Sequence, residues 1–392
     1  MKLFICILAL AATAMAEQTN ADLLKTSNEG FTAKMFQEVV KSKPGENVVL
    51  SAFSVLSPLA QLSLAAEGST HDEILTALGL PNDNVTKEVF SEVTNQLRSV
   101  KGVELNMANK VYVRKGEVLN EEFAVLSRDV FNSDVQNIDF EKKEDAAKEM
   151  NTWVEDHTNH KIKDLVSPDS LDEQTAAVLV NAIYFKGTWK TPFSASNTED
   201  KDFFVSKDIK VKKPTMHTTS TFKYSESQEL NAKLLELPYE GEESSLLIVL
   251  PNEIEGISAL VEKLKDPSAL TKAIEALKYN QVIVDLPKFK IETKTDLKDV
   301  LQKLNINKLF DQYEAKLTKL VQGEPRLFVS EAIQKAYIDV NEEGTEAAAA
   351  NVFGITYLSA IIAEERVFKA DHPFVFYLME EDKVLFCGVF QS

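Results

Sequence analysis

Apolar residues recur at helical spacing in four stretches of the chain, with polar residues between them. Steps of three and four positions place such residues on one face of a helix, so each stretch predicts an amphipathic helix. The four sets are Phe31, Met35, Phe36, Val39 and Val40; Ile74, Leu75 and Leu78; Ala146, Ala147, Met150, Trp153 and Val154; and Leu297, Val300, Leu301 and Leu304. Thr70 and Glu73 have the spacing of a capping box, which predicts that the second helix begins there.

Several short segments have the composition or the alternation of β-strands. They are residues 111–113, 178–185, 246–250, 282–291 and 384–390. The segment 246–250 is continuously apolar, as expected of a strand buried on both faces, whereas 282–291 alternates. Because strands and helices do not alternate strictly along the chain, we predict an α+β fold with large, partly antiparallel sheets. No linker rich in Pro, Gly or Ser divides the chain, so one large domain is expected.

The N-terminus has the pattern of a secretory signal peptide. A positive start at Lys2 precedes residues 3–16, which are apolar except for Thr13 and end in a small-x-small motif. The stretch is too short to span a bilayer. We therefore expect cleavage after Ala16, secretion, and a mature domain of residues 17–392.

Composition changes this picture by excluding several classes of protein. The 392 residues include 43 Lys and Arg against 61 Asp and Glu, a net charge of -18, which argues against nucleic-acid binding and docking on an anionic membrane. Loss of the leader removes Cys6, so Cys387 remains alone, and we expect a buried, unreactive thiol. The basic run from Lys207 to Lys213 is interpreted as a solvated hairpin edge rather than a polyanion site. Asn84 begins the only glycosylation sequon and is expected on a surface loop.

No motif of a known catalytic or metal site is present, and we predict neither enzymatic activity nor a cofactor. The chain lacks a nucleophile elbow, a zinc-binding H-E-x-x-H pair and a phosphate-binding P-loop. His157 and His160 are three positions apart on a predicted helix, but no third ligand accompanies them, so no metal site is expected.

Residues 341–372 do not have the pattern of a core segment. Four alanines at 347–350 alone would predict a helix. They follow Glu342-Glu343-Gly344, however, and lead into a mixed apolar stretch without a stable period. A long connection near the end of a compact domain is usually functional or disordered, so this segment is the first candidate for a functional site.

Six segments, in the same order along almost the whole mature chain, resemble the serpin family. They are NVVLSAFS at 47–54, THDEIL at 70–75, NAIYFKGTW at 181–189, LPKFKI at 286–291, NEEGTEAAAA at 341–350 and DHPF at 371–374. Six matches in order identify the chain as similar to serpins, and in particular to insect haemolymph serpins of the antichymotrypsin type. The resemblance implies a serpin fold, which is a single large domain with mixed β-sheets, several helices and an exposed reactive-centre loop at about 342–366.

The resemblance also implies a mechanism, in which the protein is a suicide substrate. A serine protease attacks the loop and forms an acyl-enzyme, and the cut loop then inserts as a new strand into the main sheet and deforms the protease. The implied hinge of the loop is Glu342, Gly344, Thr345, Ala347, Ala348, Ala349 and Ala350, and the implied shutter and breach of the sheet are Ser51, Ser54, Asn181, Trp189 and Gln334. Gln334 replaces the histidine of many family members. A glutamine can still donate and accept hydrogen bonds there, but it excludes an opening linked to protonation.

The side chains of the hinge suit insertion into a sheet. Thr345 and the alanines are small enough to pass between neighbouring strands. Gly344 relieves the backbone where the strand must pivot. Glu346 is expected on the solvent face of the inserted strand, where its charge stays hydrated.

The reactive bond also follows from the resemblance. In the family the specificity residue lies fourteen positions after the hinge glycine, which gives Leu358 and a bond to Ser359, with Tyr357 as the alternative. Either residue suits the apolar pocket of a chymotrypsin-like protease. We therefore expect a secreted, monomeric inhibitor that forms a covalent complex with a chymotrypsin-like serine protease. The alternative is a non-inhibitory serpin that acts as a carrier or storage protein, and the small-residue hinge argues against it.

Overall fold

Fifteen strands and nine α-helices lie in the part of the chain described by this computed structural model, residues 19–96, 103–323, 326–345 and 365–392. The helices are α1 (Asn20–Ser42), α2 (Ala52–Ala65), α3 (Gly68–Leu78), α4 (Asp83–Gln96), α5 (Glu121–Phe131), α6 (Lys143–His157), α7 (Ile257–Lys263), α8 (Pro267–Glu275) and α9 (Leu297–Lys303). The strands are β1 (Val48–Leu50), β2 (Val103–Arg114), β3 (Asp134–Ile138), β4 (Ala177–Thr188), β5 (Glu199–Phe204), β6 (Lys210–Ser227), β7 (Ala232–Pro238), β8 (Ser244–Pro251), β9 (Lys278–Pro287), β10 (Phe289–Asp296), β11 (Val329–Asn341), β12 (Gly344–Thr345), β13 (Arg366–Lys369), β14 (Phe374–Glu380) and β15 (Lys383–Phe390). The predicted helices correspond to α1, α3, α6 and α9, and the predicted strands lie in β2, β4, β8, β9, β10 and β15.

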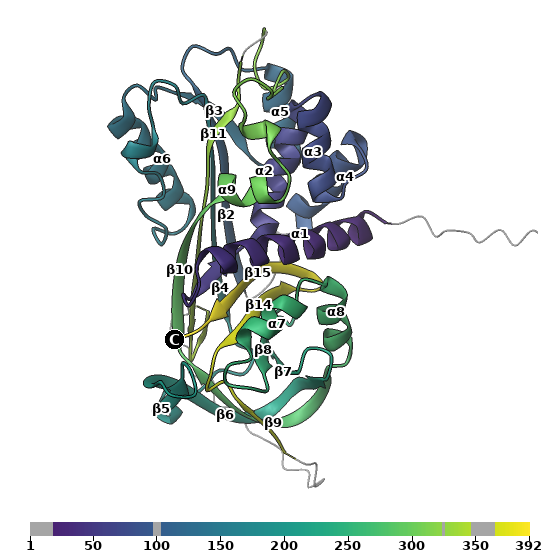
Figure 1. Ribbon diagram of the computed structural model, residues 1–392, viewed down its shortest axis with the longest axis vertical. Helices are drawn as coiled ribbons and strands as arrows, with labels where there is room; N and C mark the ends of the chain where they lie inside the picture. The colour runs from purple at the N-terminus through teal and green to yellow at the C-terminus, as the bar shows by residue number, and fades with distance from the viewer. Residues whose placement is uncertain (1–18, 97–102, 324–325, 346–364) are drawn as a thin grey trace, which may run out of the picture.

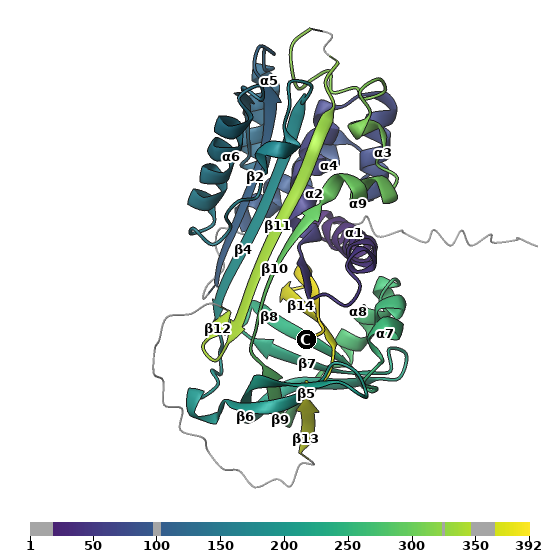
Figure 2. The ribbon, with the colours of Figure 1, turned by 60° about the vertical axis from the view of Figure 1, so that its left-hand side comes forward.

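The strands form two sheets (Figure 1). The six-stranded sheet has the order β10-β11-β12-β4-β2-β3 and is long, as its face shows in Figure 2. The nine-stranded sheet has the order β1-β15-β14-β8-β7-β6-β9-β13, with β5 beside β6. Both parallel and antiparallel pairs occur, as between β4 and β11 and between β2 and β4. The prediction of one α+β domain with mixed sheets is therefore confirmed.

The start of α3 differs from the prediction. The helix begins at Gly68, so Thr70 and Glu73 lie inside it and form no cap. The Thr70 hydroxyl accepts a hydrogen bond from the backbone N–H of Lys316 at 3.2 Å. The Glu73 carboxylate accepts two, each of 2.8 Å, from the backbone of residues 307–308. The two side chains therefore tie α3 to a distant segment of the chain instead of capping the helix.

The alternating segment 282–291 divides between the two sheets. β9 ends at Pro287 in the nine-stranded sheet, and β10 begins at Phe289 in the six-stranded sheet. Lys288 belongs to neither strand and donates its backbone N–H to the carbonyl of Pro214 at 2.8 Å. Buried residues continue on both sides of this break, so the periodicity of the sequence does not reveal it.

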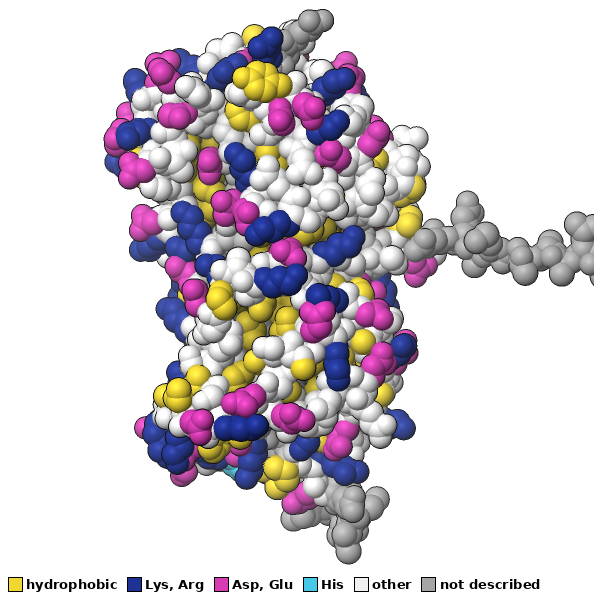
Figure 3. Space-filling model, in the orientation of Figure 1, with side chains coloured by type: hydrophobic (Ala, Val, Ile, Leu, Met, Phe, Trp, Pro, Cys, Tyr) yellow, Lys and Arg dark blue, Asp and Glu magenta, His cyan; other side chains and the backbone are white. Residues whose placement is uncertain are grey.

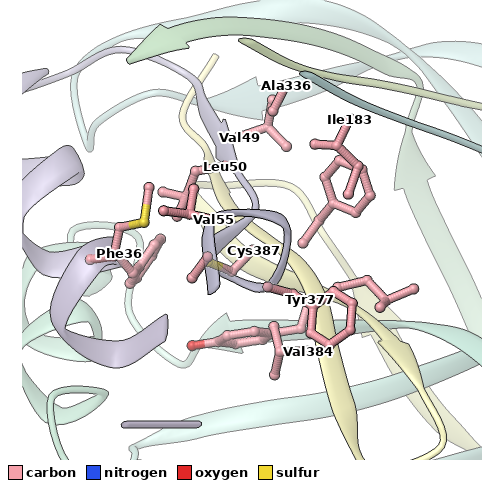
Figure 4. Packing of buried hydrophobic residues seen from close by; sticks show 14 of the residues in the cluster. Phe36, Val49, Leu50, Val55, Ile183, Ala336, Tyr377, Val384 and Cys387 are labelled. Atoms are coloured by element: carbon pink, nitrogen blue, oxygen red, sulfur yellow. The ribbon is translucent and has the colours of Figure 1, made fainter. Parts of the chain in front are cut away.

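The main hydrophobic core lies between the two sheets, where α1 and α2 also contribute (Figure 4). Phe36 of α1, Val55 of α2, Ile183 of β4 and Cys387 of β15 all belong to this core, and all four are buried. Burial raises the pKa of the Cys387 thiol, so the thiol stays protonated and unreactive, as expected. A second, smaller cluster lies on the other face of the six-stranded sheet, beneath α6.

The basic run forms the predicted hairpin edge, whereas the sequon lies in a different setting from the predicted one. Lys210 and Lys212 of β6 pair with Asp202 of β5 at 2.8 and 2.7 Å. Their hydrogen bonds lower the pKa of that carboxyl to about 2. Asn84 is exposed, but it lies in the first turn of α4 rather than in a loop, because α4 begins one residue earlier at Asp83.

The two histidines of the predicted helix lie at its C-terminal end. His157 ends α6 and stacks on Trp153, and His160 lies in the turn beyond. Within the described ranges, no group of three or more His, Cys, Asp or Glu side chains could hold a metal ion. No helix in the same ranges has the length and apolar character needed to cross a membrane. On the face seen in Figure 3, Lys and Arg side chains lie interspersed with Asp and Glu.

Candidate functional site

The predicted hinge lies where β4 and β11 part. These two strands pair directly and in parallel along part of their length, and β12 then lies between them. Gly344 pairs with Asn341 of β11 on one side and with Thr188 of β4 on the other, and Thr345 takes the next step in both ladders. Both pairings are antiparallel. The first residues of the loop therefore already form a short strand inside the sheet (Figure 2).

Gly344 lies too close to the backbone of β4 for any side chain. Its φ is +149°, and a Cβ built there would lie 2.0 Å from the carbonyl oxygen of Gly187. From the sequence we expected this glycine to relieve the backbone at a pivot. The structure adds a steric reason, because only a residue without a Cβ fits this close to β4. Thr345, the next residue, is fully buried.

Glu342 fastens the base of the hinge through three groups. Its carbonyl accepts the backbone N–H of Phe193 at 2.9 Å, and its carboxylate accepts the Thr198 hydroxyl and the Lys288 ammonium group, each at 2.8 Å. Burial raises the pKa of Glu342, but the contacts with Lys288 and Thr198 outweigh burial and hold the pKa below its usual value of 4.5. The carboxylate is therefore ionised at neutral pH.

Trp189 closes the same end of the sheet. Its indole N–H donates to the carbonyl of Asn341, and its backbone N–H donates to the carbonyl of Glu343, both at 2.9 Å. Its ring stacks on Tyr239, with the ring centroids 4.5 Å apart and 10° between the planes. The predicted breach residue thus contacts the turn that leads into β12.

The four predicted shutter residues lie together farther along the β4–β11 seam. Asn181 of β4 and Gln334 of β11 face each other in the register of the two strands. Gln334 Nε2 donates to Asn181 Oδ1 at 2.6 Å and to the carbonyl of Ser51 at 2.7 Å, and its Oε1 accepts the backbone N–H of Ser51 at 3.2 Å. Ser54 and Asn181 exchange two further hydrogen bonds of 2.9 Å. All four residues are fully buried, so their hydrogen bonds bridge the seam in the absence of bulk water.

One member of this network was not predicted from the sequence. Asn181 also donates to Oδ1 of Asn109, which faces it in the register of β2. The available signal is a polar residue two positions before the apolar run 111–113 of β2. Gln334 donates and accepts at once, as predicted for an amide at this position, and the side chains of the network include no group that titrates near neutral pH.

The remaining predicted site residues, Ala347, Ala348, Ala349, Ala350, Tyr357, Leu358 and Ser359, lie outside the described residues. The description resumes at residue 365, and β13 then pairs in parallel with β9 at the edge of the nine-stranded sheet. The segments on either side of the loop therefore belong to different sheets. Glu342, Gly344 and Thr345 lie with Trp189 at one end of the seam, and the shutter lies farther along it.

A comparison with known proteins identifies the family of the chain. The family model described as Serpin (serine protease inhibitor) matches residues 26–392. The chain belongs to the serpin family. This serpin is 56% identical over 370 residues to antichymotrypsin-2 of Bombyx mori, covering 94% of this chain and 98% of that protein. It is 54% identical over 392 residues to antitrypsin of the same species, covering 100% of both.

Solved structures agree with the family match. Serpin48 of the insect Tenebrio molitor superposes on this serpin with a TM-score of 0.87 at 38% identity, over 94% of this chain and 98% of that chain. The resemblance found in the sequence is therefore confirmed, and with it the serpin fold. The family description also names serine proteases as the class of protein that serpins inhibit.

Proposed function

We propose that this serpin is a secreted inhibitor that traps chymotrypsin-like serine proteases as acyl-enzymes by inserting its cut loop between β4 and β11. The observation that carries the proposal is β12, because the start of the loop already lies as an antiparallel strand between the two strands that insertion must separate. The inserting strand would then extend the main-chain hydrogen bonds that β12 already makes with β4 and β11. Its register would therefore already be set.

The pairing of β12 also specifies where the inserted residues would lie. Continued one residue per step, it brings residue 351 opposite both Asn181 and Gln334, and the regular pairing of β4 with β11 ends opposite residue 354. Residue 351 is an asparagine, whose amide could replace the direct bond between Asn181 and Gln334 when the strands part. Leu358 would lie beyond the regular pairing, so a protease attached there would be carried along the length of the sheet.

Alternation along the inserted strand fits the composition of the hinge. Thr345 is fully buried, and the residues two and four positions later, Ala347 and Ala349, would point inward with it. Glu346 would point to the solvent face. Small inward side chains and an outward charge are what a strand needs to enter a sheet that is already packed on its inner face.

The target class rests on the loop sequence. Antichymotrypsin-2 and antitrypsin of Bombyx mori are almost equally similar to this chain, at 56% and 54% identity. Their names therefore do not decide whether the target is chymotrypsin-like or trypsin-like. Leu358, or Tyr357 in the alternative, would fill an apolar pocket, and neither carries the positive charge that pairs with the buried carboxylate of a trypsin-like pocket. Secretion rests on the signal pattern of residues 1–16.

A complex-forming assay with the mature chain tests this proposal. We expect chymotrypsin to form a complex that survives boiling in detergent, and the C-terminal fragment, separated in denaturant, to begin at Ser359. A fragment that begins at Leu358 would assign the specificity position to Tyr357. Trypsin, and chymotrypsin whose catalytic serine is blocked, are the controls and should give no such complex. Cleavage by chymotrypsin without a stable complex would reject the proposal.

Heating separates the inhibitory function from the carrier or storage alternative. An inhibitory serpin should gain stability when its loop is cut, because the inserted strand completes the sheet and releases stored strain. Melting curves of the intact and the cut protein measure the gain. The same melting temperature for both forms would favour the non-inhibitory alternative.

A further inference from the structure

Tyr239 lies behind the hinge and is bonded to it. Its phenolic oxygen is 2.6 Å from the hydroxyl oxygen of Thr345, and both side chains are fully buried. Burial raises the pKa of Tyr239, so the phenol stays neutral and can donate or accept this hydrogen bond. The partner of Thr345 is therefore a buried group that water cannot replace.

The position of the Tyr239 ring is fixed by neighbours other than the hinge. The ring stacks on Trp189, and it meets Phe185 edge-on with the centroids 5.1 Å apart and 61° between the planes. Gly187 leaves room for it, since a Cβ there would lie 2.7 Å from Cδ1 of the ring. The phenolic hydroxyl is thus presented at a set place on the inner face of the sheet, beside the position that Thr345 occupies.

We propose that Tyr239 is a positioning residue of the inhibitory reaction. It holds Thr345 between β4 and β11 as the first inward-facing residue of the inserting strand, and it thereby fixes the register of that strand and keeps this end of the sheet parted before a protease arrives. The inference rests on the proposed function, because holding the hinge matters only if the loop inserts.

The chemistry of the neighbouring residues explains why the bond selects one register. A slip of one residue would bring Gly344, which has no side chain, or Glu346, whose charge burial disfavours, toward Tyr239. A slip of two residues toward the loop would present the methyl group of Ala347. Gly344 and Ala347 would leave a buried phenol without a partner, and Glu346 would bring a charge into a buried site, so Thr345 alone among them satisfies the phenol at no such cost.

Three variants test the inference. Tyr239→Phe removes the hydroxyl but keeps the ring and its stacking, Thr345→Val removes the other partner at nearly the same shape, and the double variant leaves neither group unpaired. Tyr224→Phe is the matched control, because it removes a hydroxyl that bonds Glu226 at 2.6 Å within β6 of the other sheet.

Two measurements apply to each variant. The first is hydrogen exchange of the backbone amides of residues 341–345 in the intact protein, which involves no protease. The second is the number of serpin molecules consumed per chymotrypsin molecule trapped. The free energy of unfolding is recorded in parallel, so that a purely structural effect can be recognised as a loss of stability without a change in the other two quantities.

We expect Tyr239→Phe to speed hinge exchange at least fivefold and to raise serpin consumption at least twofold, while Tyr224→Phe changes neither. The double variant should be no worse than either single variant, because the two residues act as one pair. Unchanged hinge exchange in Tyr239→Phe would overturn the inference, and so would faster exchange with unchanged serpin consumption. Failure of the proposed function is distinct, since the unaltered protein would then be cut without forming a stable complex.

Discussion

The hinge and the shutter lie along one seam but are held in different ways. At the hinge β4 and β11 are already parted, and β12 is fastened there by the charged side chain of Glu342 and by stacked aromatic rings. At the shutter the strands pair directly, and buried neutral side chains centred on Asn181 and Gln334 bridge them. A satisfied buried network is expensive to break unless a new partner arrives. In the proposed mechanism, insertion would therefore start at the hinge, and the shutter would be its barrier.

The largest effect should follow from blocking the hinge itself. Thr345→Arg would put a long charged side chain where Thr345 is fully buried, so we expect trapping of chymotrypsin to fall by at least about tenfold while cleavage of the loop continues. The fraction of chymotrypsin held in the detergent-stable complex measures this. Thr221→Arg, at an exposed position of β6, is the control. Undiminished trapping by Thr345→Arg would show that the hinge does not need to enter the sheet.

The shutter should dominate the stability of the intact protein. Asn181→Ala leaves buried groups of Gln334 and Ser54 without their partner, so we expect the free energy of unfolding to fall by about 2–4 kcal/mol. Unfolding in urea measures the change. Asn106→Ala, which removes an exposed 2.9 Å bond to Glu104, should cost no more than about 0.5 kcal/mol. Equal losses in the two variants would remove the distinction between shutter and surface.

Glu342 should give the hinge a dependence on acid that the shutter lacks. Because its pKa in the folded protein lies below 4.5, its stabilisation is present above pH 4.5 and is lost as the pH falls through the folded value. Glu342→Gln should lower the free energy of unfolding at neutral pH by about 1 kcal/mol and remove this part of the acid dependence. Hydrogen exchange of residues 341–345 between pH 7 and pH 3 follows the hinge directly. Lys288→Gln should lower the free energy of unfolding at neutral pH by about the same amount. If Glu342→Gln kept the acid dependence of the unaltered protein, that dependence could not be assigned to Glu342.

The smallest effect concerns the absence of titrating side chains from the shutter network. The Gln334 network should contribute the same stability from about pH 8 to pH 5, because amides and hydroxyls do not titrate there. Gln334→His would add an imidazole whose pKa burial lowers, so its contribution should be present at high pH and decline as the pH falls through about 6.5. We expect a difference of about 1 kcal/mol between the two ends of this range. A flat profile for Gln334→His would show that the position tolerates either protonation state.

Local periodicity predicted the elements whose burial is decided by their own neighbours. The apolar stripes of α1, α6 and α9, and the continuous run of β8, needed no distant partner to be recognised. The capping box failed because Thr70 and Glu73 bond to residues 307–316, which the local sequence does not reveal. The break within 282–291 was not visible in the sequence for the same reason. Tertiary contacts decide which sheet each half joins.

The site residues also differ in how far the sequence could predict them. The positions of the hinge and shutter followed from the resemblance to a family, and the structure places the described ones in two groups along one seam. Tyr239 and Asn109 were missed because their partners, Thr345 and Asn181, lie 106 and 72 positions away. A buried tyrosine or a half-buried asparagine in a strand has many uses, and only the fold shows which partner it meets.

The strands that follow the loop have a consequence for any cut made in it. β14 and β15 are interior strands of the nine-stranded sheet, and every residue of both is buried. A molecule nicked between Leu358 and Ser359 would therefore remain one particle made of two polypeptides, larger than the intact molecule only by the water that hydrolysis adds, until denaturant separates them. The C-terminal polypeptide would stay in the sheet through β13, β14 and β15, while the hinge polypeptide would carry whatever is attached to its cut end.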